Sequence, residues 1–349
     1  MNVHDGMKRF NVPGVSVTYF AGDLIRWSKH YGTLEAGASR QVDDNSIFHA
    51  CSISKMVTTL CVLRLAQDGL LDLHRDVNDY LTSWQIPDGA FTKTKKVTLA
   101  NLLAHQGGFR DGEGSFGPLA NGDSAPAPID ILIGATPYHP EPARVEYEPE
   151  TDCEYSDLGY CVIAQVLGDV LGETVPQLAA RLVFNPLGLT RTFFWGASGD
   201  PHLETRILDC ACGHDNDGRV VDGIRAIYPN TEGASLWTTT RDLAQIVIDL
   251  LKAYHGDDGA ILDAASARFM LSPYGCDVGQ GVGVFLDRDE AGRPFFFSQG
   301  WGIGMQCKLR AYYQQRDGVV VMTNSEPGVA QDESLVGEII RQVSAGHRL

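Results

Sequence analysis

Strand-forming segments lie at the two ends of this chain of 349 residues, and helix-forming segments fill its middle. Near the N-terminus, two runs rich in β-branched and aromatic residues are separated by the turn sequence AGD, which predicts a β-hairpin. Strand-like runs return only in the last quarter of the chain. We therefore predict an α+β fold in which one antiparallel sheet is built from the N- and C-terminal segments and flanked by helices. The predicted strands cover residues 13–20, 24–32, 281–287, 294–299, 304–313 and 318–324.

The middle of the chain repeats apolar residues at helical spacing and forms a mostly helical insert. Gly69 is expected to end the first helix, and Asn185 with Pro186 to end a later one. We predict a sheet subdomain of residues 1–60 plus 236–349 and a helical subdomain of residues 61–235, with the active site in the cleft between them. The predicted helices lie within residues 54–73, 98–109, 157–173, 174–189, 238–253 and 333–345.

Charge and composition limit the classes of partner. The formal net charge is −16 and the isoelectric point is about 4.9, which argues against nucleic acid, since a nucleic-acid binder needs a basic face. No apolar run is long enough to span a membrane, and the first residues lack the pattern of a secretory signal. The eight cysteines include no C-x-x-C pair, which favours reduced thiols in a cytoplasmic protein.

A serine and a lysine three residues apart stand at the predicted start of the first long helix. Ser52 and Lys55 form the S-x-x-K pattern within CSISKM. Helical spacing would bring the amine near the hydroxyl, and burial would lower the pKa of the lysine and make it a base. The alternative is a helix-capping serine followed by a solvated lysine. This motif alone does not decide between them.

Two further motifs follow in order, YSD at residues 155–157 and SQG at residues 298–300. With them the chain resembles the serine β-lactamase and penicillin-recognising superfamily, and most of all its branch of carboxylesterases, D-aminopeptidases and amide hydrolases. The similarity covers nearly the whole length, through the segments FHACSISK, LAQDGLLDLHRDVNDYL, VTLANLLAHQGGF, EYSDLGYCVIAQVLG, FNPLGL, TTTRDLA and GVVVMTNSEPG.

The resemblance implies a covalent acyl-enzyme mechanism. Ser52 would be the nucleophile, Lys55 would take or relay its proton, and Tyr155 would act as general base and as proton donor to the leaving group. A cationic Lys55 would lower the pKa of the tyrosine. The backbone N–H groups of Ser52 and Trp301 would form the oxyanion hole. The substrate-binding residues would be Asp157, Ser298, Gln299, Gly300 and Trp301.

Two positions depart from the pattern of the superfamily. Asp157 stands where asparagine is usual, and it either holds Lys55 protonated or caps the helix. Ser298 replaces the lysine or histidine that commonly recognises a substrate carboxylate. Phe295 to Phe297 and Trp301 are expected to surround the site with aromatic rings. These features predict hydrolysis of small neutral or apolar esters or amides, with weak β-lactamase activity.

Other functions remain open at this stage. A D-aminopeptidase or DD-peptidase, a β-lactamase and an acyltransferase would use the same residues, and a penicillin-binding or scaffold protein with an idle site is the non-enzymatic alternative. His105 is expected to be structural. Cys210 and Cys212 lack a zinc-binding spacing, so we expect no metal and no cofactor. The natural substrate and the oligomeric state are not indicated.

Overall fold

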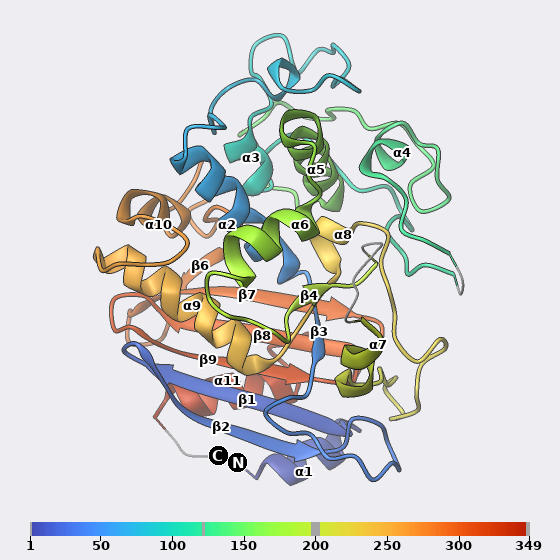
Figure 1. The fold of residues 1–349 in the computed structure, drawn as a ribbon, viewed down its shortest axis with the longest axis vertical. Helices are drawn as coiled ribbons and strands as arrows, with labels where there is room; N and C mark the ends of the chain where they lie inside the picture. The colour runs from blue at the N-terminus through green and yellow to red at the C-terminus, as the bar shows by residue number, and fades with distance from the viewer. Residues whose placement is uncertain (1, 121–122, 197–202, 347–349) are drawn as a thin grey trace.

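One antiparallel sheet brings the two ends of the chain together, as predicted. The computed structural model describes residues 2–120, 123–196 and 203–346. In the sheet the strand order is β2-β1-β9-β8-β7-β6, so the N-terminal hairpin lies beside the last strand of the chain (Figure 1). The strands are β1 (Gly14–Ala21), β2 (Leu24–Gly32), β6 (Phe285–Arg288), β7 (Pro294–Gly302), β8 (Met305–Tyr312) and β9 (Asp317–Thr323).

A second, small sheet was not predicted from the sequence. It has the order β3-β5-β4, with β3 (Phe48–Cys51), β5 (Leu236–Thr238) and β4 (Phe193–Phe194). These strands are too short to show the alternation of a half-buried strand. Strand β3 matters for the site because it leads directly into the residues before the first long helix.

The helices lie mostly in the middle of the chain, as expected. Helix α6 continues into a π-helical turn at Ala180–Phe184 and ends before Pro186, where the sequence predicted the end. Short 3-10 turns occur at Val77–Asp79 and Ile207–Asp209. The α-helices are α1 (Val3–Arg9), α2 (Ser54–Gln67), α3 (Leu99–Leu103), α4 (Pro128–Leu132), α5 (Asp157–Leu171), α6 (Val175–Ala179), α7 (Leu203–Arg206), α8 (Thr231–Ala234), α9 (Thr240–His255), α10 (Ala264–Met270) and α11 (Leu335–Ser344).

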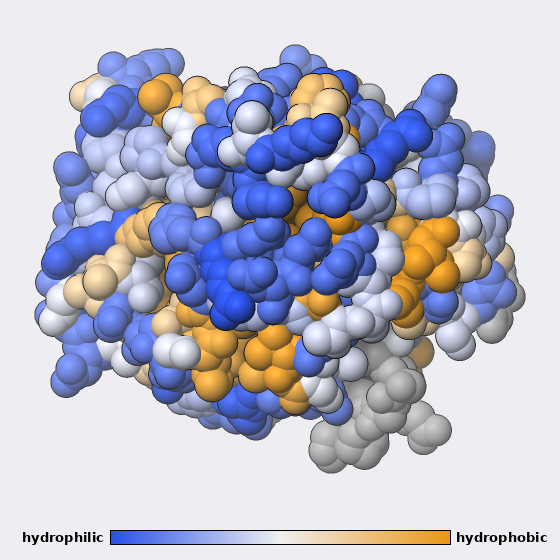
Figure 2. Space-filling view, turned by 90° about the horizontal axis from the view of Figure 1, so that it is seen from above, coloured by the Kyte–Doolittle hydropathy of each residue, from blue (hydrophilic) through white to orange (hydrophobic). Residues whose placement is uncertain are grey.

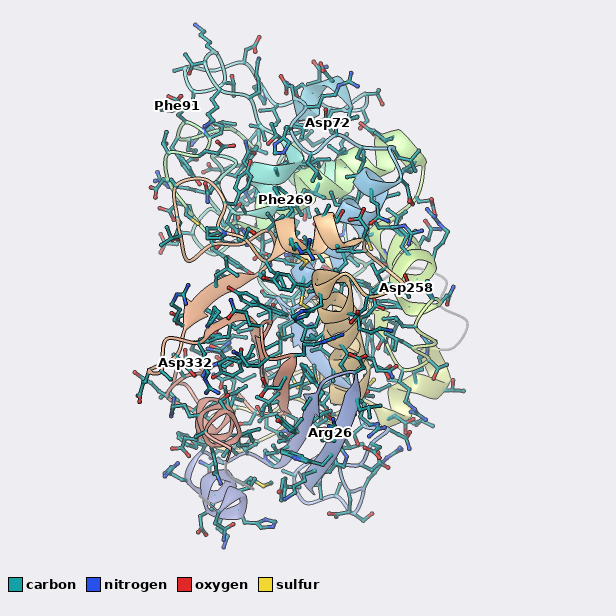
Figure 3. All side chains as sticks on the ribbon, turned by 90° about the vertical axis from the view of Figure 1, so that its left-hand side faces the viewer. Arg26, Asp72, Phe91, Asp258, Phe269 and Asp332 are labelled. Carbon is teal, nitrogen blue, oxygen red and sulfur yellow. The ribbon has the colours of Figure 1, made fainter. Side chains whose placement is uncertain are left out.

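Helices cover both faces of the main sheet. Helices α1 and α11 lie on one face and α9 lies on the other, which the edge-on view shows with Asp332 on the α11 side (Figure 3). The side chains of the strands alternate between the two faces of the sheet. The core under α1 and α11 contains Val15, Val17, Val319 and Val321. Residues such as Phe20, Phe296 and Met322 belong to the larger core shared with α2, α5 and α9.

Helix α2 joins the sheet to the helical region. Nearly all of its residues from Ser54 to Leu65 are buried, because the helix passes through the larger core rather than along the surface. The predicted subdomain boundary between residues 60 and 61 falls within this continuous helix. The division of the chain into two parts therefore stays a prediction.

Polar side chains cover most of the surface at the helical end of the molecule, with apolar groups scattered among them (Figure 2). Within the described residues, no single helix is long and apolar enough to cross a membrane. One bent pair of helices, residues 157–171 with 175–184, is long and apolar enough for a membrane span by length and composition alone. Most of the apolar residues of this pair are buried in the larger core.

Candidate active site

Ser52 lies in a tight turn between β3 and α2. The residue before it, Cys51, has a positive φ of 47°, which is uncommon for a residue other than glycine and turns the chain sharply. Helix α2 begins at Ser54, and its N-cap residue is Ile53, with no side-chain capping bond. The Ser52 hydroxyl therefore does not cap this helix, which removes the capping alternative.

All three N–H donors of the Lys55 ammonium have an acceptor. Its Nζ lies 3.4 Å from Ser52 Oγ, 3.0 Å from the carbonyl oxygen of Gly233 and 2.5 Å from Asp157 Oδ1. The side chain is almost completely buried. Burial by itself lowers the pKa of Lys55, but Asp157 and then Tyr155 together outweigh it and raise the pKa above its ordinary value. Of the two expectations for Lys55, this direction agrees with the one in which Asp157 keeps the lysine protonated, rather than with burial making it a base.

Asp157 is the first residue of α5, and its carboxylate is held by neighbours on both sides. Its Oδ1 accepts a second hydrogen bond, at 2.6 Å, from Asn230 Nδ2. The N-cap of α5 is Ser156, whose hydroxyl accepts from the N–H of Gly159. Asp157 is therefore not the helix cap, and its side chain is free to pair with Lys55.

Asp111 holds the start of α5 in place. Its carboxylate accepts hydrogen bonds from the N–H groups of Asp157 and Leu158, at 2.8 and 3.0 Å, and from Ser156 Oγ at 3.0 Å. An anion at a helix N-terminus satisfies donors that have no partner inside the helix. Burial and then the nearby Asp157 raise the pKa of Asp111. The sequence analysis missed this residue, because a single acid in a glycine-rich loop carries no pattern.

Tyr155 stands directly before this helix and faces the lysine. Its ring centroid is 4.7 Å from Lys55 Nζ, and 42% of the residue is exposed. Desolvation raises the pKa of its phenol, and the negative charge of Asp157 raises it further. Lys55 and Ser52 lower this pKa, but the net shift is upward. We expected Lys55 to lower the pKa of Tyr155. Lys55 does lower this pKa, but burial of the hydroxyl group and the charge of the Asp157 carboxylate together raise it by more.

His105 supports Tyr155 and is otherwise structural. Its Nδ1 accepts the N–H of Ser156 at 3.2 Å, and its ring stacks on Tyr155 with a centroid distance of 4.3 Å. Burial and then Lys55 lower the pKa of His105 to about 3. The imidazole is neutral at ordinary pH, and it fixes the tyrosine in place.

Strand β7 passes very close to β3 because two glycines allow it. A Cβ at Gly300 would collide with the carbonyl oxygen of Ala50, and one at Gly302 would lie 2.9 Å from Cys51 Sγ. The residue between them, Trp301, is 44% exposed, and its ring nitrogen donates to Glu326 at 2.9 Å. The strand therefore brings the backbone of Trp301 beside the turn that carries Ser52.

The remaining predicted residues of β7 lie on different faces of the strand. Ser298 is buried and shares the face of Gly300, whereas Gln299 lies on the opposite face with Trp301. The expected aromatic surround is only partly present: Phe295 and Phe296 are buried. Phe297 is half-buried and stacks on Phe285. Successive residues of a strand alternate between faces, so a run of three aromatic residues cannot face one site.

In the described parts of the chain, no group of three histidine, cysteine, aspartate or glutamate side chains forms a candidate metal site. Asn230 and Gly233 are further site residues that sequence reasoning missed. They lie at α8, which follows a long irregular segment, and only the tertiary structure brings them to Lys55.

The beta-lactamase family model matches residues 2–342 of the chain. The chain belongs to the beta-lactamase family, which confirms the resemblance. Penicillin-binding protein 4* of Bacillus subtilis (strain 168) is 24% identical over 339 residues, covering 90% of this chain and 68% of the relative. Beta-lactamase-like protein 4 of Dictyostelium discoideum is 25% identical over 77% of this chain, which spans 46% of that protein. Several other curated relatives are likewise matched over less than half of their length.

Solved structures share the whole fold. The D-amino acid amidase from Ochrobactrum anthropi SV3, complexed with D-phenylalanine, matches with a TM-score of 0.78 at 20% identity, covering 98% of this chain and 96% of the amidase. EstCE1, described as a hydrolase with promiscuous acyltransferase activity, matches with a TM-score of 0.71 at 19% identity, over 97% and 96% of the two chains. The family and these neighbours are serine hydrolases.

Proposed function

We propose that this member of the family hydrolyses small neutral or apolar esters or amides through an acyl group carried on Ser52. The observation that supports this most is the position of one nitrogen. Lys55 Nζ lies 3.4 Å from the Ser52 hydroxyl and 4.7 Å from the Tyr155 ring centroid. An idle binding protein does not need a serine, a cation and a phenol around one point.

The hydrogen bonds favour Tyr155 over Lys55 as the base. Because Asp157 keeps Lys55 protonated, the ammonium donates to Ser52 Oγ and cannot accept its proton. The serine proton then goes to the phenolate form of Tyr155, and the same phenol later protonates the leaving group. Lys55 stabilises the charge that forms on the phenolate and on Ser52. The N–H groups of Ser52 and Trp301 would bind the oxyanion, where loss of one donor costs about 10²–10³ in rate.

The substrate class is inferred from β7. Ser298 offers no cation to a substrate carboxylate, whose charge-assisted partner is worth about 1.5–3 kcal/mol. Tyr155, which faces Lys55, and Trp301 on β7 instead have exposed aromatic side chains. These rings suit an apolar acyl or alcohol group. Penicillins and peptide C-termini, which carry a carboxylate, should be poor substrates.

The test is intact-mass spectrometry of the full chain after exposure to a fluorophosphonate, benzylpenicillin and p-nitrophenyl butyrate. We expect a covalent adduct of the wild type with the fluorophosphonate and none with Ser52→Ala. An absence of adducts with every reagent would favour the non-enzymatic scaffold alternative instead.

Steady-state rates test the substrate class separately. We expect p-nitrophenyl butyrate to turn over faster than benzylpenicillin, and Ser298→Lys to narrow the difference by supplying the missing cation. Rapid turnover of benzylpenicillin by the wild type would reject the proposed preference for neutral substrates. It would not contradict the proposed acyl-enzyme mechanism. Adding an alcohol acceptor distinguishes hydrolysis from acyl transfer by the product formed.

A further inference from the structure

Two buried thiols lie directly beneath the proposed oxyanion hole. Cys51 precedes Ser52, and Cys307 lies opposite Gly300 in the β7–β8 ladder. The space that Gly300 leaves without a side chain is bordered by both: a Cβ there would be 2.9 Å from Cys51 Cβ and 2.6 Å from Cys307 Sγ. The two cysteines therefore line the same space beside Gly300. This proximity meets the first requirement for a disulfide.

A histidine is placed to activate one of the two thiols. His49 Nε2 lies 2.5 Å from the carbonyl oxygen of Ala234, which can only accept, so Nε2 carries a proton. In the neutral imidazole the other nitrogen, Nδ1, is then an acceptor, and it lies 3.5 Å from Cys51 Sγ. The ring is fixed by stacking on Trp237, with a centroid distance of 4.9 Å and an angle of 5° between planes.

The electrostatics distinguish the two sulfurs. Burial by itself raises the pKa of Cys51, but the neighbouring Cys307, then His49 and Lys55, bring it below its ordinary value. Burial and the neighbouring Cys51 raise the pKa of Cys307. These opposite directions favour Cys51 as the attacking cysteine and Cys307 as the resolving one, and both side chains are buried.

We propose that Cys51 and Cys307 are an oxidation site. A small peroxide, hydrogen peroxide, oxidises the two thiols to a reversible Cys51–Cys307 disulfide, and this bond closes the Ser52 site. His49 Nδ1 takes the proton of the Cys51 thiol, the thiolate attacks one oxygen of hydrogen peroxide, and the O–O bond breaks. Cys51 becomes a sulfenic acid, and the other oxygen takes the proton back from His49 and leaves as water. The sulfur of Cys307 then attacks Cys51 Sγ, the S–O bond breaks and a second water leaves. Two thiols are oxidised and one peroxide is reduced.

The bond would act on the site through its two flanking segments. Cys51 carries the positive φ that sets the turn before Ser52, and Cys307 packs against the carbonyl groups of Ala50 and Gly300, at 3.0 and 3.5 Å. Joining the two sulfurs draws together the backbone on both sides of the proposed oxyanion donors. This second part of the inference rests on the proposed function, whereas the oxidation site does not.

The oxidation site is tested by treating the full chain with hydrogen peroxide and mapping its peptides without reduction. We expect one linked pair containing Cys51 and Cys307, lighter by about 2 Da for the two hydrogens lost, and its disappearance after dithiothreitol. Cys307→Ser should abolish the link and Cys276→Ser, at an exposed thiol, should preserve it. Linkage of other cysteines only, or no linkage of the wild type, would overturn the oxidation site.

The effect on the site is tested by the rate of fluorophosphonate labelling before and after oxidation. We expect at least a tenfold loss that dithiothreitol restores, and a Cys307→Ser protein whose labelling peroxide does not change. A linked protein that labels at the original rate would refute closure of the site and leave the disulfide standing. If the reduced protein is never labelled, the proposed function fails, while the peptide map still decides the oxidation site.

Discussion

Among single residues, Asp157 has the largest effect on the chemistry that the site can perform. Its carboxylate binds the Lys55 ammonium at 2.5 Å and shares Oδ1 with Asn230. It raises the pKa of Lys55 and also contributes to the upward shift of Tyr155. Under the proposed mechanism we therefore expect removal of the phenol proton to limit acylation.

The exchange Asp157→Asn tests this electrostatic role. In the proposed mechanism the base is the deprotonated phenol of Tyr155. Because the pKa of Tyr155 is raised, the wild-type rate should climb with pH through the neutral range. Removing the carboxylate lowers that pKa, so the rising part of the pH–rate profile (its rising limb) should move to lower pH. The rate at pH 7 should then increase about tenfold for each pH unit that the limb moves. The measurement is kcat/KM for p-nitrophenyl butyrate between pH 6 and 10.

A matched control for this profile is Asp152→Asn, which removes the same charge from a largely exposed side chain. Its profile should follow the wild type. A limb that stays in place in Asp157→Asn, or moves to higher pH, would show that the carboxylate does not set the protonation of the site. Thermal unfolding of both variants separates a loss of fold from a change in chemistry, since breaking a buried ion pair also destabilises.

At the level of elements, the site depends on how closely β7 approaches β3. A strand normally keeps its neighbours apart by side chains, but Gly300 and Gly302 allow the backbones to touch. Helix α5 is fixed from its other side by Asp111, and α8 supplies Gly233 to Lys55. Three elements from distant parts of the chain, β7, α5 and α8, thus meet around the turn after β3 and the start of α2.

The exchange Gly300→Ala tests this close approach. The added methyl would collide with the Ala50 carbonyl and would lie 2.6 Å from Cys307 Sγ, so the two strands must separate. We expect the free energy of unfolding in urea to fall by about 1–3 kcal/mol and fluorophosphonate labelling of Ser52 to slow.

The control is Gly168→Ala in the middle of α5, where the added methyl meets nothing within 4 Å. Alanine is the better helix former by about 1 kcal/mol, so this variant should be as stable as the wild type or more so. Equal stability of Gly300→Ala and the wild type would mean that β7 does not need a glycine at that position.

For the whole molecule, folding buries a titratable group that must stay neutral. The pKa of His105 is about 3 in the folded chain, against an ordinary value of 6.5. Between these values the unfolded chain binds a proton that the folded chain does not, so the free energy of unfolding falls as the pH drops below 6.5. Asp111 and Glu232, whose pKa values are raised by burial, act in the opposite direction at the acidic end.

The exchange His105→Asn isolates this contribution, because asparagine tolerates the positive φ of 58° at this position. Urea unfolding between pH 5 and 6.5 should give a slope that is smaller than that of the wild type by up to about 1.4 kcal/mol per pH unit. Parallel slopes for the two proteins would show that His105 is not the group responsible.

The sequence by itself determined the pairing of the two chain ends into one sheet and the order of three motifs. Period-two and helical patterns are local, and each follows from residues that are neighbours in the chain. It predicted β1, β2, β7, β8, β9, α2, α5, α9 and α11 close to their observed ends. It missed β3, β4 and β5, which are too short to show a pattern. Only Leu99–Leu103 of the predicted helical segment 98–109 is α-helix, and only the second half of residues 281–287 forms a strand.

Only the tertiary structure decided the electrostatics of the site. A spacing of three residues predicted that Lys55 would lie near Ser52, since that distance is set within one turn. The pairing of Lys55 with Asp157 joins residues 102 positions apart, and the contributions of Asp111, Gly233 and Cys307 likewise come from distant segments. A pKa depends on every charge and on the depth of burial around it. For this reason the sequence could name the lysine and the tyrosine, and the packed fold was needed to show that the pKa values of both are raised.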